Sequence, residues 1–296
     1  MKGRIVVMLI DHKELVVSGK FPRTAQLKAQ YFECVDDPHS FVAKLKEAGV
    51  RADLFTFNQE LADRNPRYNY HLEWDSISVL PVTTYDHWWK RQVNCKTRNM
   101  IRKAQKSGVD VRVIEFTDDL VKGIVAIYNE SPLRQGKPFK HYGKDFEILK
   151  KAHISYLERS DFIGASYKDE LIGFVKLVHG NGISSIMQII SKIAHRDKSP
   201  TNALIAKAVE ICAQRNIPYL HYGLWSRRTL GDFKKHHAFE QFEVPRYFVP
   251  LNLRGNLVLA LGLHRKMSEY LPVRWQDFLA ILRAKWNSLR YRAPTT

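Results

Sequence analysis

The order of strands and helices expected after residue 108 limits the fold of this chain more than any other feature. Three strands follow one another directly, and the short segments 168–170 and 180–182 between them are typical of hairpin turns. A doubly wound domain would alternate strand and helix throughout, so this order argues against it. The sequence predicts strand 109–116, helix 117–129, helix 144–158, strands 162–167, 171–178 and 183–190, helix 201–214, strand 219–222, helix 230–236 and strand 242–249.

The first 107 residues predict a smaller set of α/β elements without a glycine-rich phosphate-binding motif. A helix is expected from Asp36 or Asp37 to Ala48, because Pro38 suits its first turn and Gly49 its end. Residues 84–107 predict one long helix whose cations either face solvent or contact an anion. The strands are expected at 4–10, 14–18, 31–35, 54–57 and 76–80, and the helix cations are Lys90, Arg91, Lys96, Arg98, Arg102, Lys103 and Lys106.

The net charge indicates an anionic partner. The 296 residues include 47 Lys and Arg against 30 Asp and Glu, which gives +17. Phosphates, nucleic acid or lipid headgroups would all suit such a surplus. The 45% hydrophobic content excludes an intrinsically disordered chain, and the length fits roughly two domains.

Cysteine spacing and hydropathy limit the kinds of structural site and the cellular compartment that we expect. Cys34, Cys95 and Cys212 lie far apart, which favours neither a disulfide framework nor a zinc site, so no metal is expected. The apolar run 5–10 is too short for a secretory signal, and no uncharged stretch approaches the ~20 residues of a membrane helix. We therefore expect a cytoplasmic protein, at most peripheral at the inner face of a membrane.

Two segments resemble the FemAB-like acyltransferases, which carry two GNAT-like domains. Residues 94–109 read NCKTRNMIRKAQKSGV, similar to the R-N-I-R-K-A-x-K-x-G-V segment of that group. Residues 233–239 read FKKHHAF, similar to its F-K-x-x-x-G-F, with Ala238 where glycine is usual. The resemblance covers residues 75–250 and implies an α/β acyl-CoA N-acyltransferase (GNAT) fold. It divides the chain into an incomplete GNAT-like lobe at 1–107, a complete domain at 108–250 and a basic helical extension at 251–296.

The resemblance also implies where an acyl donor binds. In the GNAT fold the strand equivalent to 183–190 splays from its neighbour, and the following loop and helix start cradle a pyrophosphate. No glycine occurs between residues 183 and 214, so the donor is either acyl-CoA, such as acetyl-CoA, or the aminoacyl-tRNA that some FemAB-like enzymes use. The implied donor-binding residues are Met187, Gln188, Ile189, Ile190, His195, Arg196, Lys198, Ser199, Thr201, Asn202 and Ala203.

Catalytic and acceptor-binding candidates lie in three places. Lys234 stands four residues before Ala238, where many GNAT enzymes have a tyrosine that protonates the leaving group; Tyr222 is the alternative acid and His237 a candidate base. The loop 128–144 is long and polar and joins the two helices on the acceptor side. Its candidates for binding an amine acceptor are Asn129, Arg134, Gln135, His141 and Tyr142.

The sequence supports functions of two classes. The first is an N-acyltransferase acting on an amino-sugar, an amino acid or an envelope-glycan precursor in polysaccharide biosynthesis, with CoA or aminoacyl-tRNA as donor. The second is a non-catalytic nucleic-acid-binding protein on a degenerate GNAT fold, indicated by charge alone. The oligomeric state is left open.

The C-terminal segment predicts an amphipathic helix. Apolar residues recur at spacings of three and four, and basic residues lie beside them. The helix either packs on the core or lies on an anionic membrane. The apolar residues are Trp275, Phe278, Leu279, Leu282, Trp286 and Leu289, and the basic ones are Arg274, Arg283, Lys285, Arg290 and Arg292.

Overall fold

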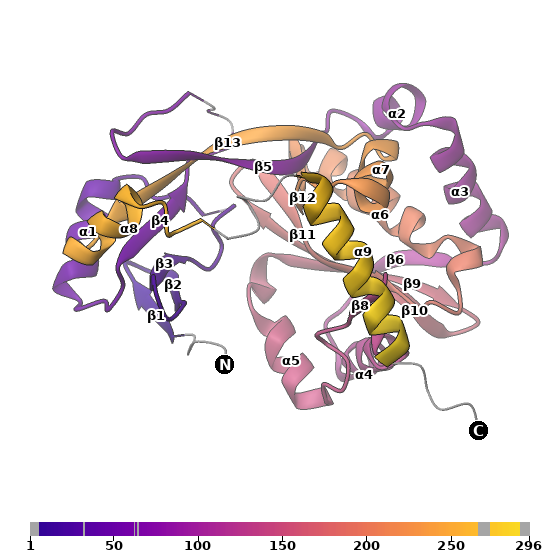
Figure 1. Cartoon of the computed structure of the whole chain (residues 1–296). Coiled ribbons are helices and arrows are strands. Elements are labelled where there is room, and N and C mark those ends of the chain that lie inside the picture. Colours follow the sequence, from indigo (N-terminus) through magenta and orange to yellow (C-terminus); the bar gives the residue numbers. More distant parts are fainter. Residues whose placement is uncertain (1–5, 32, 62, 64, 266–272, 291–296) are drawn as a thin grey trace. The chain divides into compact units, whose positions relative to one another are not determined.

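The computed structural model describes residues 6–31, 33–61, 63, 65–265 and 273–290, and the chain forms two compact units (Figure 1). Unit 1 comprises Met1–Val79, Leu224–Ser226 and Gln241–Met267, and unit 2 comprises Leu80–Gly223, Arg227–Glu240 and Ser268–Thr296. These units divide the chain differently from the boundaries expected at 107 and 250. The basic helix around residue 100 belongs to unit 2, and most of the last strand belongs to unit 1.

Unit 1 is a sheet with a helix on each face. Strand order is β1-β2-β3-β4-β13-β5. Helix α1 packs on the face that carries Phe55 and Phe57, whereas Val258 of α8 packs on Leu54 of the other face. Its elements are β1 (Val6–Ile10), β2 (Lys13–Ser18), β3 (Thr24–Leu27), α1 (Pro38–Glu47), β4 (Leu54–Asn58), β5 (His71–Pro81), β13 (Glu240–Pro250) and α8 (Leu253–Ala260).

Most local signals of unit 1 are confirmed. The Asp37 carboxylate accepts hydrogen bonds from the N–H groups of His39 and Ser40 and so caps α1. The strand expected at 31–35 is wrong, because residue 31 is in a turn and residues 33–35 are irregular backbone. The strand is β3 instead, which pairs with both β2 and β4 and buries alternate residues. Pairing with a strand on each side stabilises β3 as a strand, and the local sequence did not indicate this pairing.

Unit 2 is a five-stranded sheet, in the order β12-β11-β10-β9-β6, between two helical layers. Helices α3 and α6 pack on one face and α4 and α5 on the other. Its elements are α2 (Tyr85–His87), a π-helical turn (Trp88–Gln92), α3 (Cys95–Lys106), β6 (Asp110–Ile114), α4 (Asp118–Tyr128), β7 (Leu133–Arg134), β8 (Lys137–Pro138), α5 (Phe146–Ile154), 3-10 turns (Leu157–Arg159 and Arg196–Lys198), β9 (Ser160–Tyr167), β10 (Glu170–Gly180), β11 (Ile183–Ser191), α6 (Pro200–Gln214), β12 (Tyr219–Leu224), α7 (Arg228–His236) and α9 (Val273–Arg290).

The three-strand meander is confirmed, but two helices differ from the prediction. The helix expected at 84–107 breaks at Val93, which is extended, and Asn94 then caps α3 by accepting from Thr97 N at 2.7 Å. The helix expected to run to residue 158 ends at Ile154, shortly before Tyr156 adopts a left-handed conformation with φ of 58°. Neither break carries a glycine or proline, so no strong terminator marked it.

Strands β11 and β12 separate after a short parallel contact. Ile183, Ser184 and Ser185 pair with residues 219–221, and in the described chain no further pair joins the two strands. After Ser185, β11 pairs with β10 along one edge, and its other edge has no paired strand among the described residues. The predicted splay is therefore present, and it leaves backbone polar groups facing a gap in the sheet.

Helix α9 keeps its apolar stripe exposed. The Asn287 side chain is buried and donates to the carbonyl of Gly136 at 3.3 Å, next to β8. The side chains of Arg274, Leu289 and Arg290, and all of Arg292, lie outside the described part. Among the described helices, none is both long and apolar enough to cross a bilayer. The exposed side chains of the stripe are Trp275, Phe278, Leu279, Leu282 and Trp286.

Candidate functional site

A cavity of about 480 Å³ opens in unit 2 where β11 and β12 separate. The splayed strand β11 supplies one wall and the turn leading into α6, with its start, a second. Tyr222 of β12, helix α7 and the loop after α4 supply the others. Because the walls come from five separate segments, only the folded sheet assembles them. The lining residues are Arg134, Gln135, Phe139, Gln188, Ile189, Ile190, Ser191, Arg196, Ser199, Pro200, Thr201, Asn202, Tyr222, Thr229, Leu230 and Phe233.

A β-bulge sets the direction of β11 beside this cavity. The register with β10 moves from Lys176 opposite Gln188 to Leu177 opposite Ile186, so Met187 has no partner residue. A bulge bends a strand and re-aims its side chains. Of the four donor candidates on this strand, Gln188, Ile189 and Ile190 line the cavity and Met187 does not.

The loop after β11 is held by an internal carboxylate. Glu130 Oε2 accepts from Ile193 N at 2.6 Å, and Oε1 accepts from Ala194 N at 2.9 Å. The N–H groups of Arg196, Lys198 and Ser199 are bonded to carbonyls of the same loop. The backbone donors that would cradle a pyrophosphate here are thus largely engaged within the chain.

The start of α6 presents few free donors. Ser199 is left-handed with φ of 55°, Pro200 has no N–H, and Asn202 N is bonded to Ser199 O at 3.1 Å. The Thr201 hydroxyl lies 2.9 Å from that of Ser191. The cavity therefore meets this helix start mainly through side chains.

The remaining donor candidates fall into two groups. Arg196, Ser199, Thr201 and Asn202 line the cavity, whereas His195, Lys198 and Ala203 do not. His195 Nε2 lies 3.1 Å from the Glu170 carboxylate. Lys198 pairs with Asp197, and Ala203 is buried in the core.

Arg134 anchors the loop after α4. Its guanidinium donates to the carbonyls of Ser191 and Ile127, both at 2.7 Å, and to Glu130 at 3.1 Å. It also lies over the Phe139 ring, 5.1 Å from the centroid. Burial lowers the pKa of this guanidinium. Arg134 thus fixes the loop against β11 while it lines the cavity.

The other acceptor candidates are less directly placed. Gln135 lines the cavity, but Asn129, His141 and Tyr142 do not. Asn129 accepts from Gly143 N at 2.7 Å and closes the base of the loop. His141 packs on Phe139, and burial lowers its pKa to about 4. Tyr142 is exposed.

The three catalytic candidates lie at different depths. Tyr222 lines the cavity, and burial raises the pKa of its phenol to about 12. Lys234 is buried behind it, donates from Nζ to the carbonyl of Tyr222 at 2.7 Å, and has a pKa lowered by burial to about 8. His237 lies in the core with Nδ1 2.8 Å from Phe233 O, and burial lowers its pKa to about 4.

Sequence reasoning missed several wall residues. Glu130 and Arg134 are four residues apart, a spacing that favours an ion pair and could have drawn attention to Glu130. Leu230 carried no signal, because it resembles an ordinary helix-face residue, and Phe233 was noted only as part of the F-K-x-x-x-G-F resemblance. The wall residues without an assigned role are Thr229, Leu230 and Phe233. Glu130, which does not line the cavity but bonds the loop after β11, was missed as well.

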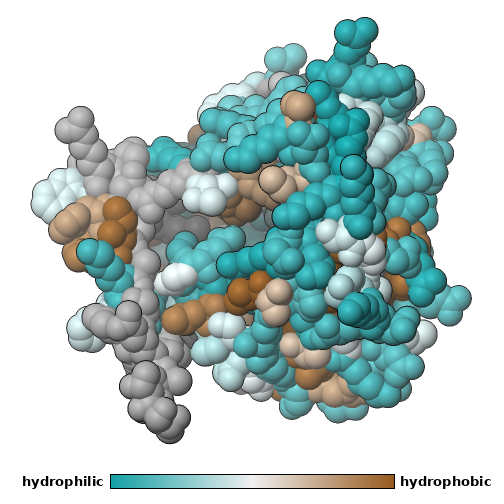
Figure 2. Space-filling model, turned by 90° about the vertical axis from the view of Figure 1, so that its right-hand side faces the viewer, coloured by the Kyte–Doolittle hydropathy of each residue, from teal (hydrophilic) through white to brown (hydrophobic). Residues whose placement is uncertain are grey.

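Exposed cations lie beside one edge of the cavity. Helix α3 contacts the turn Arg196–Lys198, and Arg196 lines the cavity. Helix α3 lies on the right of Figure 1, and that side viewed face-on in Figure 2 is mostly hydrophilic. The exposed cations of α3 are Lys96, Arg102, Lys103 and Lys106.

Comparison with solved structures identifies the fold. The chain matches FemX with a TM-score of 0.53 at 11% identity, over 87% of this chain and 90% of that one. It matches L-PGS from Bacillus licheniformis with a TM-score of 0.55 at 13% identity, over 86% and 88%. It also matches the C-terminal domain of a protein described as a lysylphosphatidylglycerol synthetase from Agrobacterium fabrum, at 0.55 and 14% identity, over 87% and 88%.

No protein-family profile and no curated protein sequence matches the chain. The structural likeness, together with the splayed strands, confirms the predicted GNAT-type α/β fold. At these identities the likeness concerns the fold, and chemistry has to be argued from the cavity.

Proposed function

We propose that this chain transfers an acyl group from an activated ester or thioester to an amine, within the cavity between β11 and β12. The observation that carries the proposal is the open edge of β11, where Gln188, Ile189 and Ile190 border the cavity and no strand of the described residues pairs with them on that side. Backbone groups there can hold an acyl chain in an extended conformation, as an added strand would be held. Holding donor and amine together supplies much of the rate enhancement.

The proposed reaction is a direct transfer. The amine nitrogen attacks the acyl carbonyl, and the new C–N bond forms as the C–O or C–S bond of the donor breaks. The nitrogen gives up one proton to solvent, and the leaving oxygen or sulfur takes up one. Tyr222 keeps its proton at neutral pH and lines the cavity, which suits it to give that proton. None of the three cysteines lines the cavity, which supports transfer without a covalent enzyme intermediate.

Lys234 serves as a positioning residue in this proposal. Its ammonium group binds the carbonyl of Tyr222 and lies 4.7 Å from the centroid of the Tyr222 ring. It therefore fixes the end of the splayed strand and keeps a positive charge behind the phenol. A cation there favours negative charge as it develops on the leaving group.

The N–H groups of the loop after β11 are largely hydrogen-bonded within the chain, and this favours an aminoacyl ester, such as aminoacyl-tRNA, over acyl-CoA as the donor. An acyl-CoA needs donors for its pyrophosphate, yet Glu130 and nearby carbonyls already hold most N–H groups of the loop 193–199. A carboxylate at this place also repels a phosphate. The exposed cations of α3 adjoin the cavity edge at Arg196, and they suit a phosphodiester backbone outside it.

Acyl-CoA is the second candidate. The Arg196 side chain and the Thr201 and Asn202 region line the cavity at the start of α6, where a phosphate would lie in the GNAT fold. Because these are side-chain contacts, we expect weaker CoA binding than a glycine-rich loop would give.

The acceptor in this proposal is an amine carried by an amino-sugar, an amino acid or an envelope precursor. The loop side of the cavity combines Phe139, which can stack on a ring, with the polar side chains of Arg134 and Gln135. Aromatic faces and convergent polar groups are typical of sites that orient such ligands.

A membrane-bound acceptor is supported by α9. Its Asn287 face is fixed to unit 2 while Trp275, Phe278 and Trp286 stay exposed, and Arg283 and Lys285 are exposed as well. Aromatic residues next to cations suit the interface of an anionic bilayer. We expect the full chain, and not a 1–252 truncation, to sediment with vesicles containing anionic lipid. Equal sedimentation of both would end this part of the proposal.

The test of the function compares the two donors. Purified protein is incubated with a mixture of amine acceptors and either radiolabelled acetyl-CoA or a mixed pool of radiolabelled aminoacyl-tRNA. Transfer from tRNA, reduced at least 10-fold by Tyr222→Phe, supports the preferred donor. Transfer from acetyl-CoA with a thermal shift supports the second. Salt-dependent tRNA binding without transfer from either donor would instead indicate the non-catalytic nucleic-acid-binding function.

A further inference from the structure

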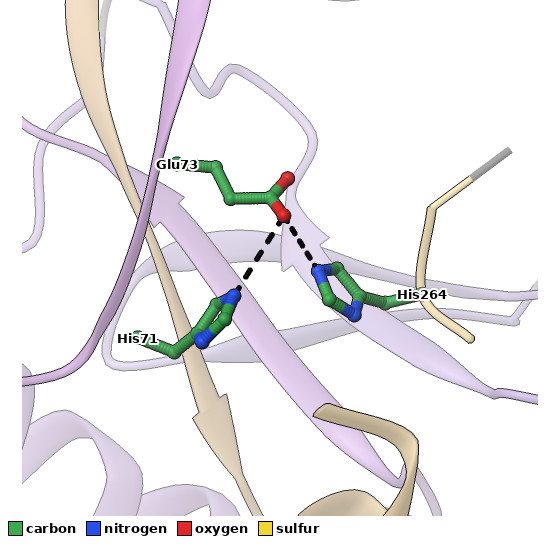
Figure 3. A group of neighbouring side chains, drawn as sticks. All are labelled: His71, Glu73 and His264. Carbon is green, nitrogen blue, oxygen red and sulfur yellow. Dashed lines mark hydrogen bonds and ion pairs between the residues drawn. The ribbon is translucent and has the colours of Figure 1, made fainter. Parts of the chain in front are cut away.

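Three side chains of unit 1 converge on one point outside the cavity described above. His71 and Glu73 are two residues apart on β5 and so share a face of the strand, and His264 follows α8. Figure 3 shows both imidazole rings directed at the Glu73 carboxylate. The nearest nitrogen and oxygen atoms of the three residues lie within 4.8 Å of one another.

The separations are close to those of a metal's ligand shell. Glu73 Oε1 lies 2.8 Å from His264 Nε2 and 3.7 Å from His71 Nε2. Zinc bonds of about 2.0–2.2 Å in tetrahedral geometry place ligand atoms about 3.4 Å apart. The two distances to Glu73 lie on either side of that value, and all three ligand atoms lie within 4.8 Å of one another, so small side-chain rotations would complete the shell.

Packing already sets the orientation of the rings. The Phe248 ring of β13 lies 4.8 Å from the His264 ring and 6.1 Å from the His71 ring, and the two imidazoles meet edge to face at 5.2 Å. The His264 side chain is only 2% exposed, whereas His71 is 35% exposed and gives access from solvent. His71 Nε2 lies 3.7 Å from Glu73 Oε1, beyond hydrogen-bond distance, so this nitrogen keeps its lone pair available for a metal ion when the ring is neutral.

We propose that His71, Glu73 and His264 bind one divalent transition-metal ion, with zinc as the best fit. Two imidazoles and a carboxylate are a donor set typical of zinc, and three protein ligands leave a fourth position for water or another ligand. Binding requires the Nδ1–H tautomer of His264, since Nε2 becomes the ligand. The ion links β5 to the segment after α8, both within unit 1, and therefore stabilises that unit.

Arg265 competes with the ion for the Glu73 carboxylate and therefore offers a variant with the opposite expected effect. Its Nε donates to Glu73 Oε1 at 2.6 Å, so an ion must displace the guanidinium. The Arg265 side chain is 45% exposed and can move into solvent. Removing it should leave zinc binding intact or tighten it, whereas removing a ligand should weaken it.

The experiment titrates zinc into the chelator-treated full-length chain and follows binding by calorimetry and melting temperature. We expect one zinc per chain and a higher melting temperature. His71→Ala should weaken binding at least 10-fold, Arg265→Ala should bind at least as tightly as the native chain, and His39→Ala, at an exposed histidine of α1, should bind unchanged. Cobalt in place of zinc should give the visible absorption of a four- or five-coordinate site that His71→Ala loses.

Two results would overturn the proposal. One is the absence of binding by the native chain at 100-fold molar excess of zinc. The other is equal affinity in the native chain and His71→Ala, which would assign the zinc to other histidines. The His71 side chain is 35% exposed and lies beyond hydrogen-bond distance of Glu73, so its substitution should leave the fold intact, and far-UV circular dichroism checks this.

Discussion

Replacing Glu130 by alanine should destabilise unit 2, because this carboxylate joins the loop after α4 to the loop after β11. The carboxylate accepts two backbone hydrogen bonds, at 2.6 and 2.9 Å, and pairs with Arg134 at 3.1 Å. Its side chain is 19% exposed and that of Arg134 13%. The substitution therefore leaves two N–H groups and a largely buried guanidinium without their anion.

The magnitude follows from those contacts. Hydrogen bonds to a charged group contribute about 1.5–3 kcal/mol each, and removing one partner of a buried ion pair costs about 3–5 kcal/mol in total. Partial solvent access and the two carbonyl contacts of Arg134 place the expected loss near the lower end, about 3 kcal/mol. For a protein of this size each kcal/mol lowers the melting temperature by about 2–4 °C.

Urea unfolding of the native chain, Glu130→Ala and Glu130→Gln measures this loss. The glutamine variant keeps an acceptor oxygen and should lose less, while Glu158→Ala, at an exposed carboxylate of unit 2, is the matched control. Pyrophosphate at millimolar concentration should restore stability to Glu130→Ala more than it stabilises the native chain, since it can occupy the freed N–H groups. A loss below about 1 kcal/mol, or equal responses to pyrophosphate, would refute the interpretation of Glu130 as an internal anion.

Three further predictions concern Lys234, acid pH and alkaline pH. Lys234→Ala should lower turnover by about 10–1,000-fold and Lys235→Ala, at the exposed neighbour, should not; full activity of Lys234→Ala would remove Lys234 from the site. Burial lowers the pKa of Lys234 from 10.5 to about 8, so the unfolded chain binds more protons than the native chain between these pH values. The free energy of unfolding of the native chain should therefore rise by about 3 kcal/mol, relative to Lys234→Met, as pH rises from 8 to 10.5. A constant difference between the two would contradict the burial argument. Burial lowers the pKa of four histidines to about 4: His141, His153, His221 and His237. The free energy of unfolding should therefore fall as pH drops from 6.5 to 4, by up to about 1.4 kcal/mol per pH unit for each group. Urea midpoints that do not change with pH in this range would contradict the prediction.

Local chemistry in the sequence determined most elements of this protein. Asp37 and Thr117 cap their helices through their own side chains, and the polar turns at 168–170 and 180–182 join strands whose pairing follows directly from adjacency. Because these interactions span only a few residues, the sequence displays both partners together. The meander and its flanking helices then left few arrangements, and the GNAT-type fold was among them.

Tertiary structure alone decided the contacts between distant residues. Strand β3 exists because β2 and β4 flank it, and Arg134 meets Ser191 only after the sheet has formed. Glu130 reaches backbone groups 63 residues away, and His264 reaches Glu73 across 191 residues, with no pattern in the sequence to pair them. Such contacts depend on which strands become neighbours, and that choice is made by burial over the whole sheet rather than by any one segment.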